Sequence, residues 1–494
     1  MRLHYPYRTA ATFTILLTTT LWQPAADAAD ADTMVRRLDS RLELLTDDWL
    51  VDRLTNARFR LHSPMEREAV FRFDKPWEGG LSAYVTLLRD GERLRMYYRG
   101  GGDLVREHTC VAESDDGIHW TRPVLGLFEF EGSKDNNIIW TGERKAYDES
   151  HNFSPFIDAN PAAAPEQRYK AVTLARRESD GERKNVLVGF ISGDGIHWKR
   201  LRNEPLITTG AFDSHNVVFW DTVAEHYVCY LRQGREGKKS VSRCTSPDFI
   251  HWSDPVPLDF GDTPLEHFYT NGIVPCFRAP HIYLGFPMRF VHPTDRNTIG
   301  LPPRKTDGFS DAVFMSSHDG LHWSRTFMEA FIRPGLDPAR WGGAHGNNTP
   351  SWGIVQTGTN EISIYWGVNY SNYPEKNRIP ELRRGTLRLD GFVSVNAPYA
   401  GGECVTRPLV FTGGQLIINY STSAVGSVQV ELQDADGKPI PGFELENTVA
   451  IWGDEIERVV TWKHGPDVSA LAGQVVRVRF VMQDADLYSI RFRE

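Results

Sequence analysis

The chain has 494 residues, with 64 acidic and 55 basic side chains that give a net charge of −9 at pH 7. This acidic excess argues against nucleic acids and anionic membranes as partners, because both attract basic surfaces. The length exceeds that of one ordinary domain, so we expect one large and one small domain.

The first 28 residues have the pattern of a secretory signal peptide. Arg2 and Arg8 precede an apolar run that ends at Trp22, and Ala26-Asp27-Ala28 is a small-x-small cleavage site. We therefore expect residues 1–28 to be removed and the protein to be secreted or periplasmic, with an uncleaved anchor as the alternative. No other stretch approaches the roughly 20 consecutive apolar residues of a membrane helix, so no membrane association is expected after cleavage.

Strand signals dominate the next 350 residues. A first hairpin is predicted from the apolar runs 83–88 and 94–98, which flank a turn that contains Gly91. Further strand-rich segments begin near His151, Asp213, His267 and His345. Long amphipathic helical patterns are nearly absent, which predicts an all-β fold.

One heptapeptide, of the form Ser-x-Asp-x-x-His-Trp, occurs four times and ends at Trp120, Trp198, Trp252 and Trp323. Uneven spacing of copied turns is typical of β-propeller blades with variable loops. In three copies a glycine follows the aspartate, which suits a turn that the tryptophan anchors. Asp116, Asp194, Asp248 and Asp319 are therefore predicted to be structural, as are the histidines of the motif. Five strand-rich segments with four motifs indicate a five-bladed propeller over residues 29–383.

The pattern changes near residue 384. Alternating strands such as 416–420, 428–432 and 475–481 follow without the heptapeptide, separated by turns at Asp436-Gly437 and Pro441-Gly442. Residues 384–494 are predicted to form a separate β-sandwich.

Five cysteines do not form a disulfide framework in a chain of this length. Cys229 and Cys244 flank a turn at 234–238 and could face each other across a hairpin. A disulfide and a pair of unlinked core thiols both remain open for them.

The predicted starts of the inner strands are rich in acidic residues, histidine and asparagine. Because inner strands converge on a propeller axis, these side chains are expected to line one pocket. Two facing carboxylates there would suit cleavage of a glycosidic bond. The alternative is that Asp148 and Asp213 only cap turns. The candidate acids are Asp148, Glu149, Asp213 and Glu266, and the candidate substrate ligands are His151, Asn152, His215, Asn216, His267, Asn271, Arg278, His281 and His345.

Several arginines near these segments suggest an anionic ligand. Arg99, Arg278 and Arg289 could bind an acidic sugar, a sulfate or inorganic phosphate, because guanidinium groups match such anions. Salt bridges between blades are the alternative. No arrangement of residues has metal-ligand spacing, and His345 is expected to contact sugar rather than a cation. We therefore expect no metal and no cofactor.

The motif and the acids at the blade starts together resemble the five-bladed β-propeller glycoside hydrolases, the grouping of invertases, fructosidases, arabinanases and β-xylosidases. The resemblance covers about residues 40–383. It implies Glu266 as general acid, Asp213 as the carboxylate that orients the sugar or tunes a pKa, and Asp148 or Glu149 as base or nucleophile.

The chain departs from this grouping in two ways. The first acid of the grouping lies on the first blade, which makes Glu78 a competing candidate. The Asn-Asp-Pro-Asn signature of invertases is missing, so a fructan substrate is not supported. The sequence thus predicts a secreted glycoside hydrolase that acts on a polysaccharide or oligosaccharide. A glycoside phosphorylase and a non-catalytic carbohydrate-binding protein are the alternatives.

Overall fold

The computed structural model describes residues 35–101, 107–142, 148–179, 182–292, 308–341, 347–370 and 378–494. The predicted signal peptide and His345 lie outside these ranges. Regular structure in the described ranges is β-strand, apart from short 3-10 turns at Pro165–Gln167, Pro338–Arg340, Leu445–Asn447 and Ser469–Leu471. The predicted all-β class is confirmed. None of the described helices has the length and apolar character of a membrane span.

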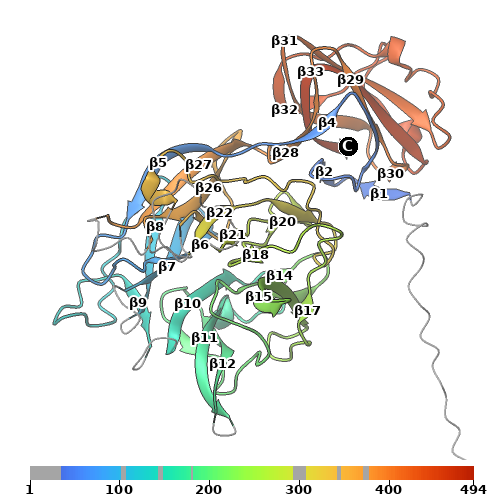
Figure 1. Cartoon of the computed structure of the whole chain (residues 1–494). Helices are drawn as coiled ribbons and strands as arrows, with labels where there is room; N and C mark the ends of the chain where they lie inside the picture. Colours follow the sequence, from blue (N-terminus) through green and yellow to red (C-terminus); the bar gives the residue numbers. More distant parts are fainter. Residues whose placement is uncertain are drawn as a thin grey trace, which may run out of the picture.

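Antiparallel sheets follow one another along the central part of the chain, in the lower part of Figure 1. The first three sheets each contain four strands in simple up-and-down order. Their strands are rich in valine, leucine and tyrosine and are bounded by turns. The strands are β6 (Ala83–Asp90), β7 (Arg93–Gly100), β8 (His108–Ser114) and β9 (Ile138–Thr141); β10 (Asp148–Ile157), β11 (Tyr169–Ser179), β12 (Glu182–Ser192) and β13 (Lys199–Arg200); and β14 (Val217–Asp221), β15 (His226–Arg235), β16 (Lys238–Ser246) and β17 (Val256–Pro257).

The fourth sheet is broken across its middle into two three-stranded halves. Pro287 lies at the break in the second strand, where it cannot donate a ladder hydrogen bond. One half contains β18 (His267–Phe268), β21 (Met288–Val291) and β22 (Phe309–Ala312), and the other contains β19 (Val274–Cys276), β20 (Ala279–Gly285) and β23 (Met315–Ser317).

The fifth sheet takes one strand from the N-terminal side of the propeller. Its strands are β24 (Thr349–Pro350), β25 (Val355–Gly358), β26 (Glu361–Val368), β27 (Glu381–Arg388) and β5 (Met65–Arg72). β5 pairs antiparallel with β27, so the first and last strands of the propeller lie in one blade.

Contacts between neighbouring sheets close the five sheets into a ring. β10 contacts both β6 and β14, β16 contacts β18, and β22 contacts β24. The ring is completed where β26 contacts β6 and Thr86 bridges Trp352. This arrangement is a five-bladed β-propeller, as the sequence predicted.

The four heptapeptides occupy equivalent turns after the third strands of the first four blades. In the first copy, Asp116 Oδ1 accepts the backbone N–H of His119 at 2.8 Å, and Asp116 Oδ2 lies 2.7 Å from the His119 ring Nδ1. Trp120 Nε1 donates to the Gly117 carbonyl at 3.1 Å. The carboxylate contacts recur in the other three copies. The motif therefore works as a closed turn, in keeping with its predicted structural role.

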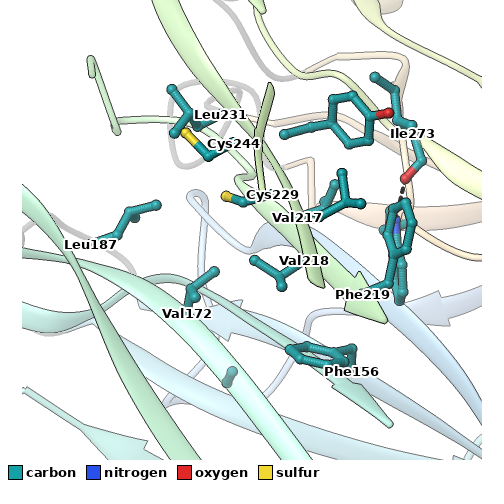
Figure 2. Packing of buried hydrophobic residues seen from close by; sticks show 14 of the residues in the cluster. Phe156, Val172, Leu187, Val217, Val218, Phe219, Cys229, Leu231, Cys244 and Ile273 are labelled. Carbon is teal, nitrogen blue, oxygen red and sulfur yellow. Dashed lines mark hydrogen bonds between the residues drawn. The ribbon is translucent and has the colours of Figure 1, made fainter. Parts of the chain in front are cut away.

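An apolar core fills the space between the second and third blades, as Figure 2 shows. Cys229 and Cys244 lie in this core, directly opposite each other in the register of β15 and β16. Both are free thiols. The facing arrangement was predicted correctly, and the two thiols are not linked.

A second β domain combines a segment before the propeller with the segment after it. β4 pairs with β28, β3 pairs with β29 and β2 pairs with β33. Leu38 and Leu50 pack in one core with Trp462. The strands are β1 (Arg36–Asp39), β2 (Leu42–Leu44), β3 (Val51–Thr55), β4 (Arg58–Leu61), β28 (Val393–Ala397), β29 (Gly402–Thr406), β30 (Leu409–Phe411), β31 (Gln415–Asp434), β32 (Asp454–Val459) and β33 (Val476–Arg493).

The domain boundaries differ from the predicted ranges 29–383 and 384–494. Residues 36–61 belong to the second domain, and β27 extends the propeller to Arg388. The reason is that β1 to β4 pair with strands more than 300 residues away, which local periodicity does not reveal.

The two domains are joined by a buried polar cluster. Glu43 of β2 lies 3.0 Å from His281 Nε2 and 2.8 Å from His318 Nε2. Burial alone would raise the pKa of Glu43, but the hydrogen bonds with both histidines lower it below its usual value. The Phe314 and Phe392 rings stack beside this cluster at 5.9 Å.

Candidate active site

Hydrogen bonds link successive blades near the starts of their inner strands. Arg99 at the end of β7 donates to Asn152 Oδ1 at 2.8 Å. Asn152 donates in turn to the Ser214 carbonyl at 3.1 Å, and Ser214 Oγ donates to the Tyr269 carbonyl at 2.6 Å. Side chains of blades one to four are therefore tied together around one end of the axis.

The backbone at this end is left-handed in four blades, and in three of them the residue carries a side chain. Tyr84, Asn152, Gly272 and Asn348 have positive φ angles of 55°, 58°, 55° and 59°. For a residue with a side chain this conformation costs about 1–3 kcal/mol, and such strain concentrates at functional sites. Bulges in β6 and β10 accompany the strain.

Asp213 is the partly exposed member of a chain of three side chains that contact one another, Asp213, His151 and Glu107. His151 Nε2 lies 3.0 Å from Asp213 Oδ1, and His151 Nδ1 lies 2.7 Å from Glu107 Oε2. The Asp213 side chain is 34% exposed, whereas those of His151 and Glu107 are 3% and 1% exposed. The His151 ring is therefore held between two carboxylates through both of its nitrogens.

Asp213 remains ionised over the whole physiological range. Burial raises the pKa of Asp213, but the hydrogen bond from His151 and the charges of Arg232 and Arg99 bring it down to about 2. Arg232 Nη2 lies 3.7 Å from Asp213 Oδ2. The group is therefore suited to act as a base, a nucleophile or an electrostatic stabiliser rather than as a proton donor.

Aromatic rings and a second cation surround this carboxylate. The Arg99 guanidinium lies 4.7 Å from the Tyr84 ring centre, and the Arg232 guanidinium lies 5.0 Å from the Tyr269 ring centre. Lys239 Nζ lies 4.3 Å from the same Tyr269 ring. Burial and the nearby Arg232 lower the pKa of Lys239 to about 8. Sugars are commonly recognised by such combinations of ring faces and charged donors.

Glu149 and Glu266, two of the predicted catalytic acids, are each held by two arginines. Glu149 pairs with Arg177 and, at 2.5 Å, with Arg200 of the outer strand β13. Glu266 lies 2.9 Å from Arg289 Nη1 and 2.6 Å from Arg325 Nη2. Both carboxylates are therefore already engaged in ion pairs.

The remaining candidate acids are Asp148 and Glu78. Asp148 pairs through its backbone with Ala175 of β11, and its side chain lies outside the described atoms. Glu78 is buried, lies 2.9 Å from Arg122 Nε and accepts a hydrogen bond from the Tyr98 hydroxyl at 2.5 Å. These contacts tie Glu78 into the core of the first blade.

The asparagines and His267 bind backbone groups around the site, and His215 contacts a side chain. Asn216 donates to the Phe212 carbonyl at 2.7 Å, and Asn271 donates to the His215 carbonyl at 3.1 Å. His267 Nδ1 accepts the Lys239 backbone N–H at 3.1 Å. Burial lowers the pKa of His215 to about 3, so this ring is neutral beside Thr86.

Arg278 and His281 lie at the domain interface rather than beside Asp213. Arg278 Nη1 binds Asp390 at 2.7 Å, and His281 binds Glu43 at 3.0 Å. Both residues belong to the part of blade four that faces the second domain. His345, the last predicted ligand, is outside the described residues.

Sequence reasoning missed Glu107, Arg232, Lys239 and the tyrosines at the site. The first strand of each blade begins at the axial end, so the second strand ends there and the third strand begins there. Arg232 lies near the end of β15, Lys239 at the start of β16 and Glu107 just before β8. These three charged residues could therefore have been found by also examining the ends of second strands and the starts of third strands.

A cavity of about 990 Å³ lies away from these residues, at the junction of the two domains. Trp49, Asp221, His318 and Trp323 are among its lining residues, and none of the predicted catalytic acids is. No group of three or more potential metal ligands occurs within the described ranges.

Comparison with known proteins finds similar structures at low identity. A glycoside hydrolase matches 66% of this chain and 92% of its own, with 12% identity and a TM-score of 0.42. An N-acetylgalactosamine deacetylase from F. plautii matches 67% and 96%, with 13% identity and a TM-score of 0.43. A GH32 β-fructofuranosidase from Bombyx mori matches 88% and 94%, with 11% identity and a TM-score of 0.40.

No protein family and no curated protein match the chain. Glycoside hydrolases are thus among the structures that this chain resembles, as the repeated motif predicted.

Proposed function

We propose that the protein is an exported glycoside hydrolase that cleaves a polysaccharide or oligosaccharide at the axial site. The observation that carries this proposal is the ionised, partly exposed Asp213, which is held by His151 and Glu107 and flanked by tyrosine rings. A fixed carboxylate beside aromatic walls can stabilise the positive charge that develops at an anomeric carbon.

In this proposal Asp213 is the base or nucleophile, not only the orienting carboxylate that the resemblance implies. Its low pKa keeps it charged, and His151 fixes the direction of its oxygens. The proton donor must be a second group, because glycosidic cleavage needs an acid opposite the carboxylate. Asp148, which begins β10 in the neighbouring blade, and Glu266 are the two acids to test for that role.

The test is release of sugar from a panel of plant and algal polysaccharides and aryl glycosides. Asp213→Asn keeps the shape of the side chain but removes its charge, so we expect turnover to fall by about 10³-fold or more with folding intact. Asp262→Asn is the matched control, since Asp262 is an exposed acid of the same propeller. Equal activity of Asp213→Asn and the wild type would contradict the proposal.

Two other functions are distinguished by the same panel. A glycoside phosphorylase would need added phosphate for turnover, and the cations Arg232 and Lys239 are the feature that favours it. A carbohydrate-binding protein would retain polysaccharide without releasing sugar. The arginine pairs on Glu149 and Glu266 favour that reading, since they occupy two of the predicted acids.

A further inference from the structure

Among the residues that the structure describes, cations outnumber carboxylates around Asp213. Around Asp213, the described residues supply two carboxylates, Asp213 and Glu107, and three cations, Arg99, Arg232 and Lys239. The cations therefore outnumber the carboxylates by one among these described residues.

Lys239 is the cation without a partner. Within the described part of the chain, no acceptor lies at hydrogen-bond distance from its Nζ, which packs 4.3 Å from the Tyr269 ring and 4.9 Å from the Phe290 ring. A half-buried ammonium loses part of its hydration, and this loss is unfavourable unless an acceptor replaces the water. The lowered pKa of Lys239 reflects this burial and the proximity of Arg232.

Arg232 is only partly satisfied. Its Nε donates to the Ala211 carbonyl at 2.9 Å, while its buried Nη1 finds no acceptor among the described residues. Arg232 and Lys239 lie against the same Tyr269 ring, and Arg232 also lies beside Asp213. Two like charges placed together and held by packing form a preorganised anion site.

We propose that the substrate carries an anionic group, a carboxylate or a sulfate, on the sugar bound next to Asp213, and that Lys239 and Arg232 bind it. This inference rests on the proposed function, because it names the class of sugar that the same site takes. The anion would supply the acceptors that both cations lack. Asp213 keeps its contact with His151 through Oδ1, and Arg232, 3.7 Å from Oδ2, would lie between this carboxylate and the anion.

The test compares acidic polysaccharides with neutral counterparts. Polygalacturonate is paired with galactan, alginate with mannan, and a sulfated galactan separates sulfate from carboxylate. We expect the wild type to bind or cleave at least one acidic member about tenfold better than its neutral counterpart, because charge-assisted hydrogen bonds are the strong ones. The preference should weaken in high salt and above pH 8, where Lys239 loses its proton.

Three variants isolate the charge of Lys239. Lys239→Met should lower affinity for the acidic member about tenfold more than affinity for the neutral member, whereas Lys239→Arg should keep the preference. Lys184→Met, at an exposed position of β12, is the matched control and should behave as the wild type. Melting curves of all variants confirm folding.

The outcomes separate this inference from the proposed function. Turnover of neutral sugars with no preference for acidic ones would overturn the inference and leave the glycoside hydrolase proposal standing. Equal losses on acidic and neutral sugars in Lys239→Met would also overturn it. Binding of acidic sugars with no release would support the anion site and contradict the hydrolase.

Discussion

Asp213 is the residue on which the proposed chemistry depends, and two of the residues that position it belong to other blades. His151 of blade two fixes one oxygen, and Glu107, just before the third strand of blade one, fixes the imidazole. The sequence singled out Asp213 and His151 because both lie at the start of an inner strand. The sequence could not single out Glu107, because the packing of blade one against blade two brings this residue to His151, and no local pattern in the chain marks it.

Glu107 is predicted to act through His151. In Glu107→Gln the charged acceptor behind the His151 ring is replaced by a neutral amide, so the ring is held less firmly toward Asp213. We expect kcat to fall about 10- to 100-fold and the pH profile to shift, with KM changed little. Steady-state kinetics from pH 4 to 9 measures both effects. An unchanged pH profile would mean that Glu107 has only a structural role.

The low pKa of Asp213 predicts a stability change at acid pH. Because its pKa is depressed from 3.8 to about 2, its contribution is present above pH 3.8 and is lost as the pH falls through 2. A third of the side chain is exposed, so solvent screening leaves about 1 kcal/mol.

Denaturant unfolding of the wild type and Asp213→Asn measures this contribution at pH 5 and pH 2. The wild type should lose about 1 kcal/mol more than the variant between the two values. An equal loss of unfolding free energy in the two proteins would show that the Asp213 carboxylate does not stabilise the fold.

At the scale of the element, the heptapeptide turn is the feature that the sequence predicted best. Its aspartate binds two backbone N–H groups and a histidine ring within four residues, so the motif carries its own structure wherever it occurs. The fourth copy departs from the others in one contact. Trp323 Nε1 is buried without a partner among the described residues, whereas Trp120, Trp198 and Trp252 donate to a carbonyl.

Loss of a motif aspartate should destabilise the fold without changing the chemistry. Asp194 accepts two backbone N–H groups that no other acceptor serves, so Asp194→Ala should lower the free energy of unfolding by about 1–2 kcal/mol. Activity per folded molecule should stay within twofold. Asp135→Ala, in an exposed turn of blade one, is the control. A large loss of activity without a loss of stability would contradict the structural role.

At the scale of the whole molecule, the number of blades was predictable and the domain boundary was not. Five strand-rich segments with four motifs sufficed to count blades. No local sequence pattern in the short strands β1 to β4 indicates which strands they pair with, because the partner strands follow the propeller in sequence. The site was predictable only in part for the same reason, since Lys239, Arg232 and Glu107 reach the axis from second and third strands.

The second domain is predicted to need its N-terminal strands. A fragment of residues 384–494 would leave β28 and β29 without β4 and β3 and would remove Leu38 and Leu50 from the core. We expect this fragment to be unfolded by circular dichroism and to gain structure when a peptide of residues 35–62 is added. A folded fragment without the peptide would contradict the assignment of β1 to β4 to this domain.

The most direct test of the central claim is sugar release by the wild type, Asp213→Asn and Asp262→Asn, side by side on the polysaccharide panel. The account predicts release by the wild type and by Asp262→Asn, and almost none by a folded Asp213→Asn. Release by all three proteins at similar rates would contradict it, because the axial carboxylate would then take no part in the reaction.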